Sequence, residues 1–351
     1  MDDLFFHRSS HLVDLVAPAS RILEIQHPSG RIAWFEDGAW DPWNHTECAM
    51  ALTAMGALDG AQRAFDHLLE TQRDDGAWLG EYGNSLPTVD RDYISREPAP
   101  AFLDSNFCAY PAVGVLHYLL ATGDEDRVRR WWPMVRMAID FVCSLQRSDG
   151  TISWAFEAVG TADDDALLAG NASIAKSLEC AISLATRLGE AVPHWAPARK
   201  ALIAALRNTP EGFDKSRRGE RFAMDWYYPV LSGALSPAAG RARLRSRWKT
   251  FVDPQRGCRC VSDEPWVTVA ETCELAMALL SVDQRTDAAA LLESVSSYRD
   301  DDGVYWMGWQ YAEETVWPRE TPGWTQAAII LATDALYGTR THSRLLIAPS
   351  P

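Results

Sequence analysis

The sequence predicts an all-α protein folded as a single (α/α)6 barrel, a closed ring of six helical hairpins. Three observations predict this fold: a turn motif that recurs six times, a series of apolar runs that alternates with these turns, and a series of amphipathic segments between them. Six units without polar capping repeats indicate one closed ring rather than an open array.

The turn motif places a glycine after polar residues and, in its strong copies, an aromatic residue soon after it. Strong copies stand at 27–34, 73–78, 147–154 and 299–306, and weaker ones at 209–212 and 254–257. The first three strong copies each follow a glutamine, at Gln26, Gln72 and Gln146. The turn glycines therefore mark six units, with glycines at positions 30, 76, 150, 212, 257 and 303.

Six apolar runs rich in Ala, Gly, Cys and Thr are expected to form the inner helices, because a helix buried on every side is apolar nearly all round. They span 45–58, 106–121, 172–188, 226–235, 268–280 and 324–336. Cysteines hold a common place in four of these runs, at Cys48, Cys108, Cys180 and Cys273. We expect them to be reduced packing residues rather than half-cystines.

Six amphipathic segments, with apolar residues at helical spacing on one face, are expected to form the outer helices. They span 12–25, 61–72, 127–146, 194–207, 239–252 and 286–298, and Pro18 is expected to start or kink the first. Residues 1–337 are thus expected to form the barrel domain. Residues 338–351 lack periodicity and are expected to form a C-terminal tail.

The composition argues against several classes of protein. Hydrophobic residues make up 47% of the 351 residues and charged residues 23%, which is ordinary for a folded globular chain. The net charge of −15 makes nucleic acid and anionic membrane surfaces poor partners. No run approaches the roughly 18 apolar residues of a membrane-spanning helix, and the first ten residues lack the pattern of a signal peptide. We therefore expect a soluble cytoplasmic protein that acts on a small molecule. The sequence does not indicate its oligomeric state.

Fifteen tryptophans are the unusual feature of the composition. Four belong to the turn motif, at positions 34, 78, 154 and 306, and four to outer helices, at 131, 132, 195 and 248. Most of the others lie in or beside the long connections from outer to inner helices. Because these connections are expected to open on one face of the barrel, that face is the expected ligand site.

The candidate catalytic residues are acidic or hydrogen-bonding side chains at this face: Asp225, Glu47, Glu271, His45 and Tyr227. Asp225 is the preferred proton donor, because neighbouring aromatic residues would raise the pKa of its carboxyl. Helix capping by Asp225 and by Glu47 stays open as an alternative. Substrate binding is expected at Trp43, Asp41, Trp226, Tyr228, Trp266, Trp317 and Trp324.

Neither a cofactor nor a metal ion is expected. The pair Cys258 and Cys260 has no partner cluster, and the eight histidines are scattered without ligand spacing. Nucleotide-binding motifs are absent from the sequence. The acidic run at 163–165 is expected to be solvated surface.

The glutamine-containing turns at 72–78 and 146–154, repeated between alternating helices, resemble the repeats of the terpenoid cyclase and protein prenyltransferase superfamily. The resemblance spans nearly the whole chain and implies a standalone bacterial biosynthetic enzyme. It further implies acid-initiated cyclisation, or related isoprenoid chemistry, in a cavity whose Trp and Tyr faces stabilise cations. The run Asp163-Asp-Asp165 is one acid short of the superfamily's Asp-x-Asp-Asp motif.

A second resemblance, at the level of the fold, is to six-hairpin sugar-processing enzymes such as glycoside hydrolases, lyases and epimerases. It implies sugars stacked on tryptophans, with Glu47, Asp225 and Glu271 as acid and base. A non-catalytic ligand-binding barrel is a third alternative. The cyclase is the preferred hypothesis, and it requires an apolar pocket with one protonated acid, whereas a sugar enzyme requires several carboxylates.

Overall fold

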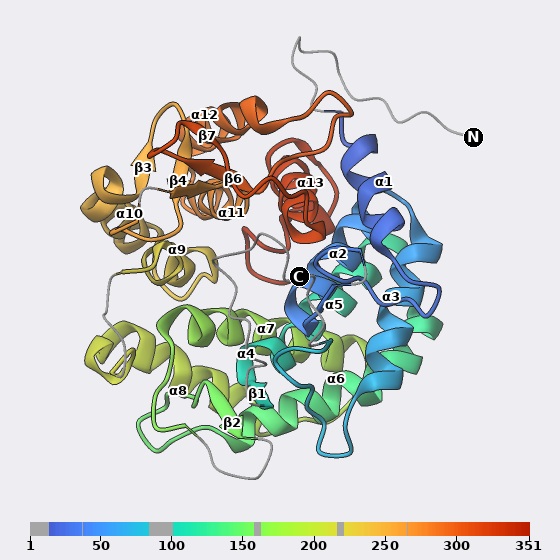
Figure 1. Ribbon diagram of the computed structural model, residues 1–351. Coiled ribbons are helices and arrows are strands. Elements are labelled where there is room, and N and C mark those ends of the chain that lie inside the picture. The colour runs from blue at the N-terminus through green and yellow to red at the C-terminus, as the bar shows by residue number, and fades with distance from the viewer. Residues whose placement is uncertain (1–13, 37, 84–100, 158–162, 216–220, 265) are drawn as a thin grey trace.

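The computed structural model describes residues 14–36, 38–83, 101–157, 163–215, 221–264 and 266–351, and it confirms the (α/α)6 barrel. The inner helices are α2 (Pro42–Ala54), α5 (Pro111–Thr122), α7 (Leu168–Leu188), α9 (Ala223–Leu231), α11 (Val269–Leu280) and α13 (Gly323–Tyr337). Each inner helix packs on the next, and α13 packs on α2, which closes the ring (Figure 1).

The outer helices surround this ring. They are α1 (Val16–Ile25), α3 (Leu58–Thr71), α6 (Glu125–Ser144), α8 (Trp195–Asn208), α10 (Pro237–Phe251) and α12 (Arg285–Ser294). Short helices complete the chain: α4 (Ser105–Ala109), η1 (Pro210–Gly212), η2 (Val295–Tyr298) and η3 (His342–Arg344). Helix α2 begins three residues earlier than expected, because Asp41 caps it and Pro42 occupies its first position.

The recurring turn has a defined architectural role. Gly30, Gly76 and Gly150 adopt positive φ angles of 91°, 86° and 88°, which favour glycine. In the first copy the side-chain amide of Gln26 donates to the carbonyl of Gly30 at 3.1 Å and to the carbonyl of Gly60 in the next outer helix at 2.9 Å. The glutamines of the next two copies make the equivalent pairs of hydrogen bonds. The glutamine therefore ties each turn to the following hairpin.

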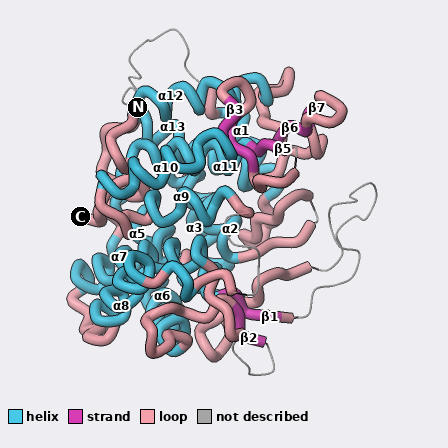
Figure 2. The backbone as a smooth tube through the Cα atoms, turned by 90° about the vertical axis from the view of Figure 1, so that its left-hand side faces the viewer, coloured by secondary structure: helices cyan, strands magenta, loops and turns pink. Residues whose placement is uncertain are grey.

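Short strands, which the sequence analysis did not predict, lie in the long connections at one end of the barrel (Figure 2). An antiparallel sheet has the order β3 (Val252–Asp253), β4 (Gly257–Arg259), β5 (Trp266–Thr268), β6 (Gly308–Gln310) and β7 (Thr315–Val316). Strands β1 (Phe102–Asp104) and β2 (Ala155–Glu157) form a separate pair. Strands of two or three residues are too short to show an alternating pattern. We call this end of the barrel the mouth.

Residues 339–351, the C-terminal segment, lie at the end of the barrel opposite the mouth (Figure 2). The ammonium group of Lys176 in α7 donates to the carbonyl of Ala348 at 2.7 Å. The backbone N–H of Ser350 donates to the Glu179 carboxylate at 2.8 Å. The division into a barrel domain and a tail stays a prediction, but the segment itself is docked against the inner helices.

All seven cysteines carry free thiols, and those at 48, 108, 180 and 273 are buried, as expected of packing residues. Among the described helices, none combines the length and the hydrophobicity that a membrane span requires. The cytoplasmic location stays a prediction.

Candidate active site

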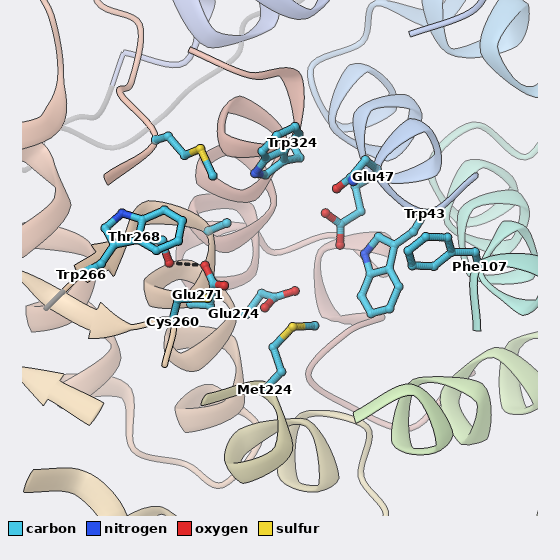
Figure 3. A pocket seen from close by; sticks show the side chains of 13 residues that line it. Trp43, Glu47, Phe107, Met224, Cys260, Trp266, Thr268, Glu271, Glu274 and Trp324 are labelled. Carbon is cyan, nitrogen blue, oxygen red and sulfur yellow. Dashed lines mark hydrogen bonds between the residues drawn. The ribbon is translucent and has the colours of Figure 1, made fainter. Parts of the chain in front are cut away.

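A cavity of about 360 Å³ opens at the mouth, inside the ring of inner helices (Figure 3). It is lined by Trp43, Asn44, Glu47, Phe107, Met224, Cys260, Trp266, Thr268, Ala270, Glu271, Glu274, Met307 and Trp324. Three of these residues are glutamates and three are tryptophans. The cavity lies among the long connections, the face on which a ligand site was expected.

The glutamates come from two sides of the cavity (Figure 3). Glu47 projects from the second turn of α2, whereas Glu271 and Glu274 project from α11. Glu47 does not cap its helix, because the Asp41 carboxylate accepts the N–H of Asn44 at 2.9 Å and fills that role. Five of the predicted residues are thus brought together here: Glu47, Glu271, Trp43, Trp266 and Trp324.

Glu47 is a carboxyl group poised to exchange a proton near neutral pH. Burial raises its pKa to about 7, and the negative charges of Asp41 and Glu271 act in the same direction. Hydrogen bonds from Trp43 and Tyr110 oppose this rise, and the Tyr110 hydroxyl donates to Glu47 at 3.2 Å. A pKa near the working pH suits a group that must give up and regain a proton.

Glu271 stands in the first turn of α11, where the Thr268 hydroxyl donates a hydrogen bond to its carboxylate. Thr268 precedes the helix by one residue, so this contact orients Glu271 from the adjacent strand β5. The side chain is partly exposed to the cavity. Glu271 is therefore a positioned carboxylate in contact with the space where a substrate would lie.

Glu274 lies deeper and is 9% exposed. The hydroxyls of Tyr227 and Tyr228 each donate to one of its oxygens, at 2.5 Å for Tyr228. Burial, followed by the nearby charge of Glu47, raises the pKa of Glu274 well above its usual range. Tyr227, predicted to be catalytic, and Tyr228, predicted to bind substrate, thus hold Glu274 in place from outside this cavity, which neither tyrosine lines.

The indole rings of the wall are held by further aromatic contacts. Trp43 stacks on Tyr110 with ring centres 4.9 Å apart and an interplanar angle of 21°. The indole N–H of Trp266 donates to the Trp317 carbonyl at 3.2 Å, and the two rings meet edge to face. Trp317 therefore supports Trp266 rather than lining the cavity itself. Rigid aromatic faces of this kind offer large contact area.

A second cavity of about 220 Å³ adjoins the first, and three residues line both: Trp43, Phe107 and Met224. Asp225 and Asp104 lie in the wall of this second cavity. Asp104 caps α4, and burial raises its pKa to about 7. Asp225, the preferred proton donor of the sequence analysis, accepts the backbone N–H of Ala169 at 3.4 Å. It lies apart from the three glutamates, so its catalytic role stays a prediction that the geometry favours less than that of Glu47.

The structure gives His45 an architectural role. Its Nδ1 accepts the N–H of Ile32 at 3.1 Å, and its Nε2 donates to the carbonyl of Ala64 at 2.8 Å. Burial lowers its pKa to about 4, so the ring is neutral. In three other units the residue two positions after the turn glycine donates its N–H to a helix side chain. The acceptors are Cys108 of α4, Asn171 of α7 and Gln326 of α13. His45 is the member of this repeated set in the first unit.

Two more of the predicted substrate-binding residues lie outside the cavity lined by Glu47, Glu271 and Glu274, which we call the glutamate cavity. Asp41 is 1% exposed and accepts the indole N–H of Trp34 at 2.6 Å in addition to capping α2. Trp226 stacks on Phe251 and donates its indole N–H to the Arg243 carbonyl at 2.7 Å. Both residues stabilise the scaffold behind the site.

Sequence reasoning missed several residues of the cavity wall. Phe107 and Met224 lie in helices, Thr268 in strand β5 and Met307 just before β6, and none of these residue types indicates a chemical role by itself. Glu274 did have a signal, because it follows Glu271 by three positions and so shares its helix face.

Glycosidases are among the known proteins to which this chain is similar. No family model matches the chain. The chain is 46% identical over 321 residues to the MMP endo-(1,4)-3-O-methyl-α-D-mannosidase of Mycolicibacterium hassiacum, covering 92% of this chain and 85% of that protein. A glycosidase in complex with glucose shares the fold with a TM-score of 0.65 at 14% identity, over 95% of this chain and 96% of that one. The GH63 mannosylglycerate hydrolase of Thermus thermophilus gives 0.67 at 12% identity, over 90% and 99%.

These findings correct the predicted membership of the terpenoid cyclase and protein prenyltransferase superfamily, which is wrong, as are the isoprenoid cyclisation and the biosynthetic role it implied. The physical reason is that the glutamine turn ties each hairpin to the next. The motif therefore indicates the barrel fold and not the reaction that the barrel carries out. A wall with three glutamates also disagrees with a cavity built around one acid. The alternative, a carbohydrate-active enzyme on the same barrel, agrees with the mannosidase relative.

Proposed function

Since the chain belongs to the family of the MMP endo-(1,4)-3-O-methyl-α-D-mannosidase, we propose that it is a glycoside hydrolase that cleaves internal α-(1→4) bonds in chains of 3-O-methyl-D-mannose. The reaction adds one water across the glycosidic bond. The products are two shorter chains, one of which carries the new reducing end.

The observation that supports this proposal most directly is the placement of Glu47 and Glu271 on opposite sides of one cavity. Glycosidases use two carboxyl groups that flank the scissile bond. One protonates the departing oxygen, and the other acts as a carboxylate on the opposite face of the sugar ring.

The environments of the two glutamates suggest how these roles divide. Glu47, whose pKa burial raises to about 7, retains a proton near neutral pH and is assigned as the general acid. Glu271, partly exposed and oriented by Thr268, is assigned as the carboxylate that acts at the anomeric carbon or its attacking water. Glu274, held by the hydroxyls of Tyr227 and Tyr228, is a third carboxyl group in the wall of the same cavity.

The apolar part of the cavity wall suits a methylated sugar. Met224, Met307 and Cys260 face the same space as the glutamates. A 3-O-methyl group adds apolar surface to the sugar, and burying it against thioether and indole groups is favourable. The indoles of Trp43 and Trp266 offer faces for the C–H surfaces of the ring.

The adjoining cavity offers room for a neighbouring sugar unit. It shares Trp43 with the glutamate cavity and continues toward Asp104 and Asn171. An enzyme that cleaves inside a chain must hold sugar units on both sides of the scissile bond. Two adjoining cavities with shared lining residues agree with this requirement.

The experiment is to incubate the purified protein with an α-(1→4)-linked 3-O-methylmannose oligosaccharide and with its unmethylated counterpart. We expect mass spectrometry to show shorter oligosaccharides from the methylated chain, with no product from Glu271→Gln. Release of single sugars from one end would contradict the internal mode of cleavage, and no product from either chain would contradict the proposed function.

A further inference from the structure

Three potential metal ligands meet at the end of the barrel opposite the mouth. They are His117 of α5, Asp334 of α13 and His342 of η3, and one ligand atom from each lies within 4.8 Å of the others. The Nε2 atom of His342 lies 3.8 Å from a carboxylate oxygen of Asp334. The two imidazole rings meet edge to face with centres 5.1 Å apart.

The two histidines are buried with unused nitrogen atoms. His117 is 2% exposed and His342 is 4% exposed. The Nδ1 atom of each has no hydrogen-bond partner in the described part of the chain. Buried polar atoms are nearly always paired in native proteins, so an unpaired nitrogen on each of two neighbouring histidine rings indicates a missing partner.

We propose that His117, Asp334 and His342 bind one Zn²⁺ ion. Two imidazole nitrogens and one carboxylate oxygen form a ligand set that zinc accepts, whereas magnesium and calcium prefer oxygen ligands throughout. Zinc–nitrogen bonds of about 2.0–2.1 Å place tetrahedral ligands roughly 3.3 Å apart, so the ligand atoms must close by about 1.5 Å at most. Rotation of the side chains supplies a movement of this size. A water molecule would complete the four ligands.

The protonation states and the surrounding contacts agree with this ligand set. Burial lowers the pKa of His117 to about 3 and moves that of His342 in the same direction, so both rings are neutral, the form that binds metal. The Ser343 hydroxyl donates to one oxygen of Asp334 at 2.9 Å, and the other oxygen faces His342. Such contacts orient a ligating carboxylate.

The position of the cluster assigns it a structural role. Asp334 follows the cavity residue Trp324 by ten positions on α13, which corresponds to about 15 Å along the helix. The zinc ion would join α5, α13 and the C-terminal segment. Leu346 of that segment lines a small cavity beneath Glu47 and Glu274, so the ion would secure the part of the chain that closes the barrel under the site.

The test is to purify the chain without chelator, remove metal, and add back Zn²⁺ or Co²⁺. We expect one zinc ion per chain by elemental analysis, absorption bands of tetrahedral Co²⁺, and a higher Tm with zinc than with EDTA. His342→Ala is expected to weaken zinc binding at least 100-fold. His194→Ala is the matched control, because His194 also pairs with an aspartate, Asp140, but at the surface.

Asp334→Asn is a second variant that retains the shape of the side chain, and it is expected to weaken zinc binding as well. If both variants bind zinc as tightly as the wild type, the proposal is wrong. If His342→Ala fails to fold, the wild-type spectrum decides, because absence of the tetrahedral Co²⁺ bands overturns the proposal. The proposal does not depend on the glycosidase activity, since none of these measurements requires turnover.

Discussion

Replacing Glu47 by glutamine separates the catalytic role of this residue from its effect on stability. An amide of the same shape cannot deliver a proton to the departing oxygen. General acid catalysis contributes roughly 10²–10⁴-fold to a rate, so we expect kcat for Glu47→Gln to fall by that factor. The KM is expected to change far less, because the shape of the cavity is retained.

The free energy of unfolding of Glu47→Gln is expected to be higher than that of the wild type at alkaline pH, although its activity is lower. Folding raises the pKa of Glu47 from 4.5 to about 7, so the folded protein is destabilised where the carboxyl is ionised. The destabilisation begins above pH 4.5 and is complete above pH 7. At about 1.36 kcal/mol per pKa unit it reaches at most about 3 kcal/mol, an upper limit because the Glu47 side chain is only partly buried. Glu47→Gln is therefore expected to match the wild type at pH 4 and to be more stable at pH 8.

The assay measures Tm at pH 4 and pH 8 by calorimetry, together with hydrolysis of the methylated oligosaccharide. A chain of this size unfolds with an entropy that makes 1 kcal/mol worth roughly 1.4 °C, so the gain at pH 8 is at most about 4 °C. Glu293→Gln, at an exposed position of α12, is the matched control and should change neither quantity. A Glu47→Gln variant that keeps a tenth or more of the activity, or that melts well below the wild type at pH 8, would refute the reasoning.

Four further predictions follow from the same geometry. Wild-type kcat/KM should decline above about pH 7 as Glu47 loses its proton, and a flat profile up to pH 9 would show that another group is the acid. Glu271→Gln should lose at least 100-fold in kcat, whereas Thr268→Val should lose less, and equal activity of wild type and Glu271→Gln would remove that residue from the mechanism. Met224→Gln should lower the preference for methylated over unmethylated chains, measured as the ratio of kcat/KM values, and an unchanged ratio would show that the methyl group binds elsewhere. Because burial lowers the pKa of His45 to about 4, its contribution to stability is present above pH 6.5 and is lost as the pH falls through 4, so His45→Ala should weaken the pH dependence of Tm in this range.

The fold could be predicted because its repeats have a physical cause that the sequence displays. Gln26, Gln72 and Gln146 recur at the same place since each ties a turn to the next outer helix. The strands β3 to β7 could not be predicted, because their pairing joins connections of two units and depends on the closed ring.

The candidate site could be predicted only in part. Glu47 and Glu271 stood out as acids near the start of apolar helices, and the structure brings them to one cavity. Asp225 has the same sequence signature, yet α9 places it in the adjoining cavity. Sequence position indicates the end of the barrel at which a side chain lies, but the rotation of each helix decides which cavity it enters.

The activity was misassigned for a related reason. The glutamine turn is a packing device, so its resemblance to terpenoid cyclase repeats indicated shared architecture and nothing of the reaction. The information on the reaction lies in the acids and aromatic residues of the mouth, where Glu47, Glu271 and Trp43 converge.

The most direct test of the account is the product pattern from an α-(1→4)-linked 3-O-methylmannose oligosaccharide incubated with wild type, Glu47→Gln and Glu271→Gln. The account predicts internal cleavage by the wild type and loss of at least 100-fold in rate for each variant. Undiminished cleavage by both variants, or no cleavage by the folded wild type, would contradict it.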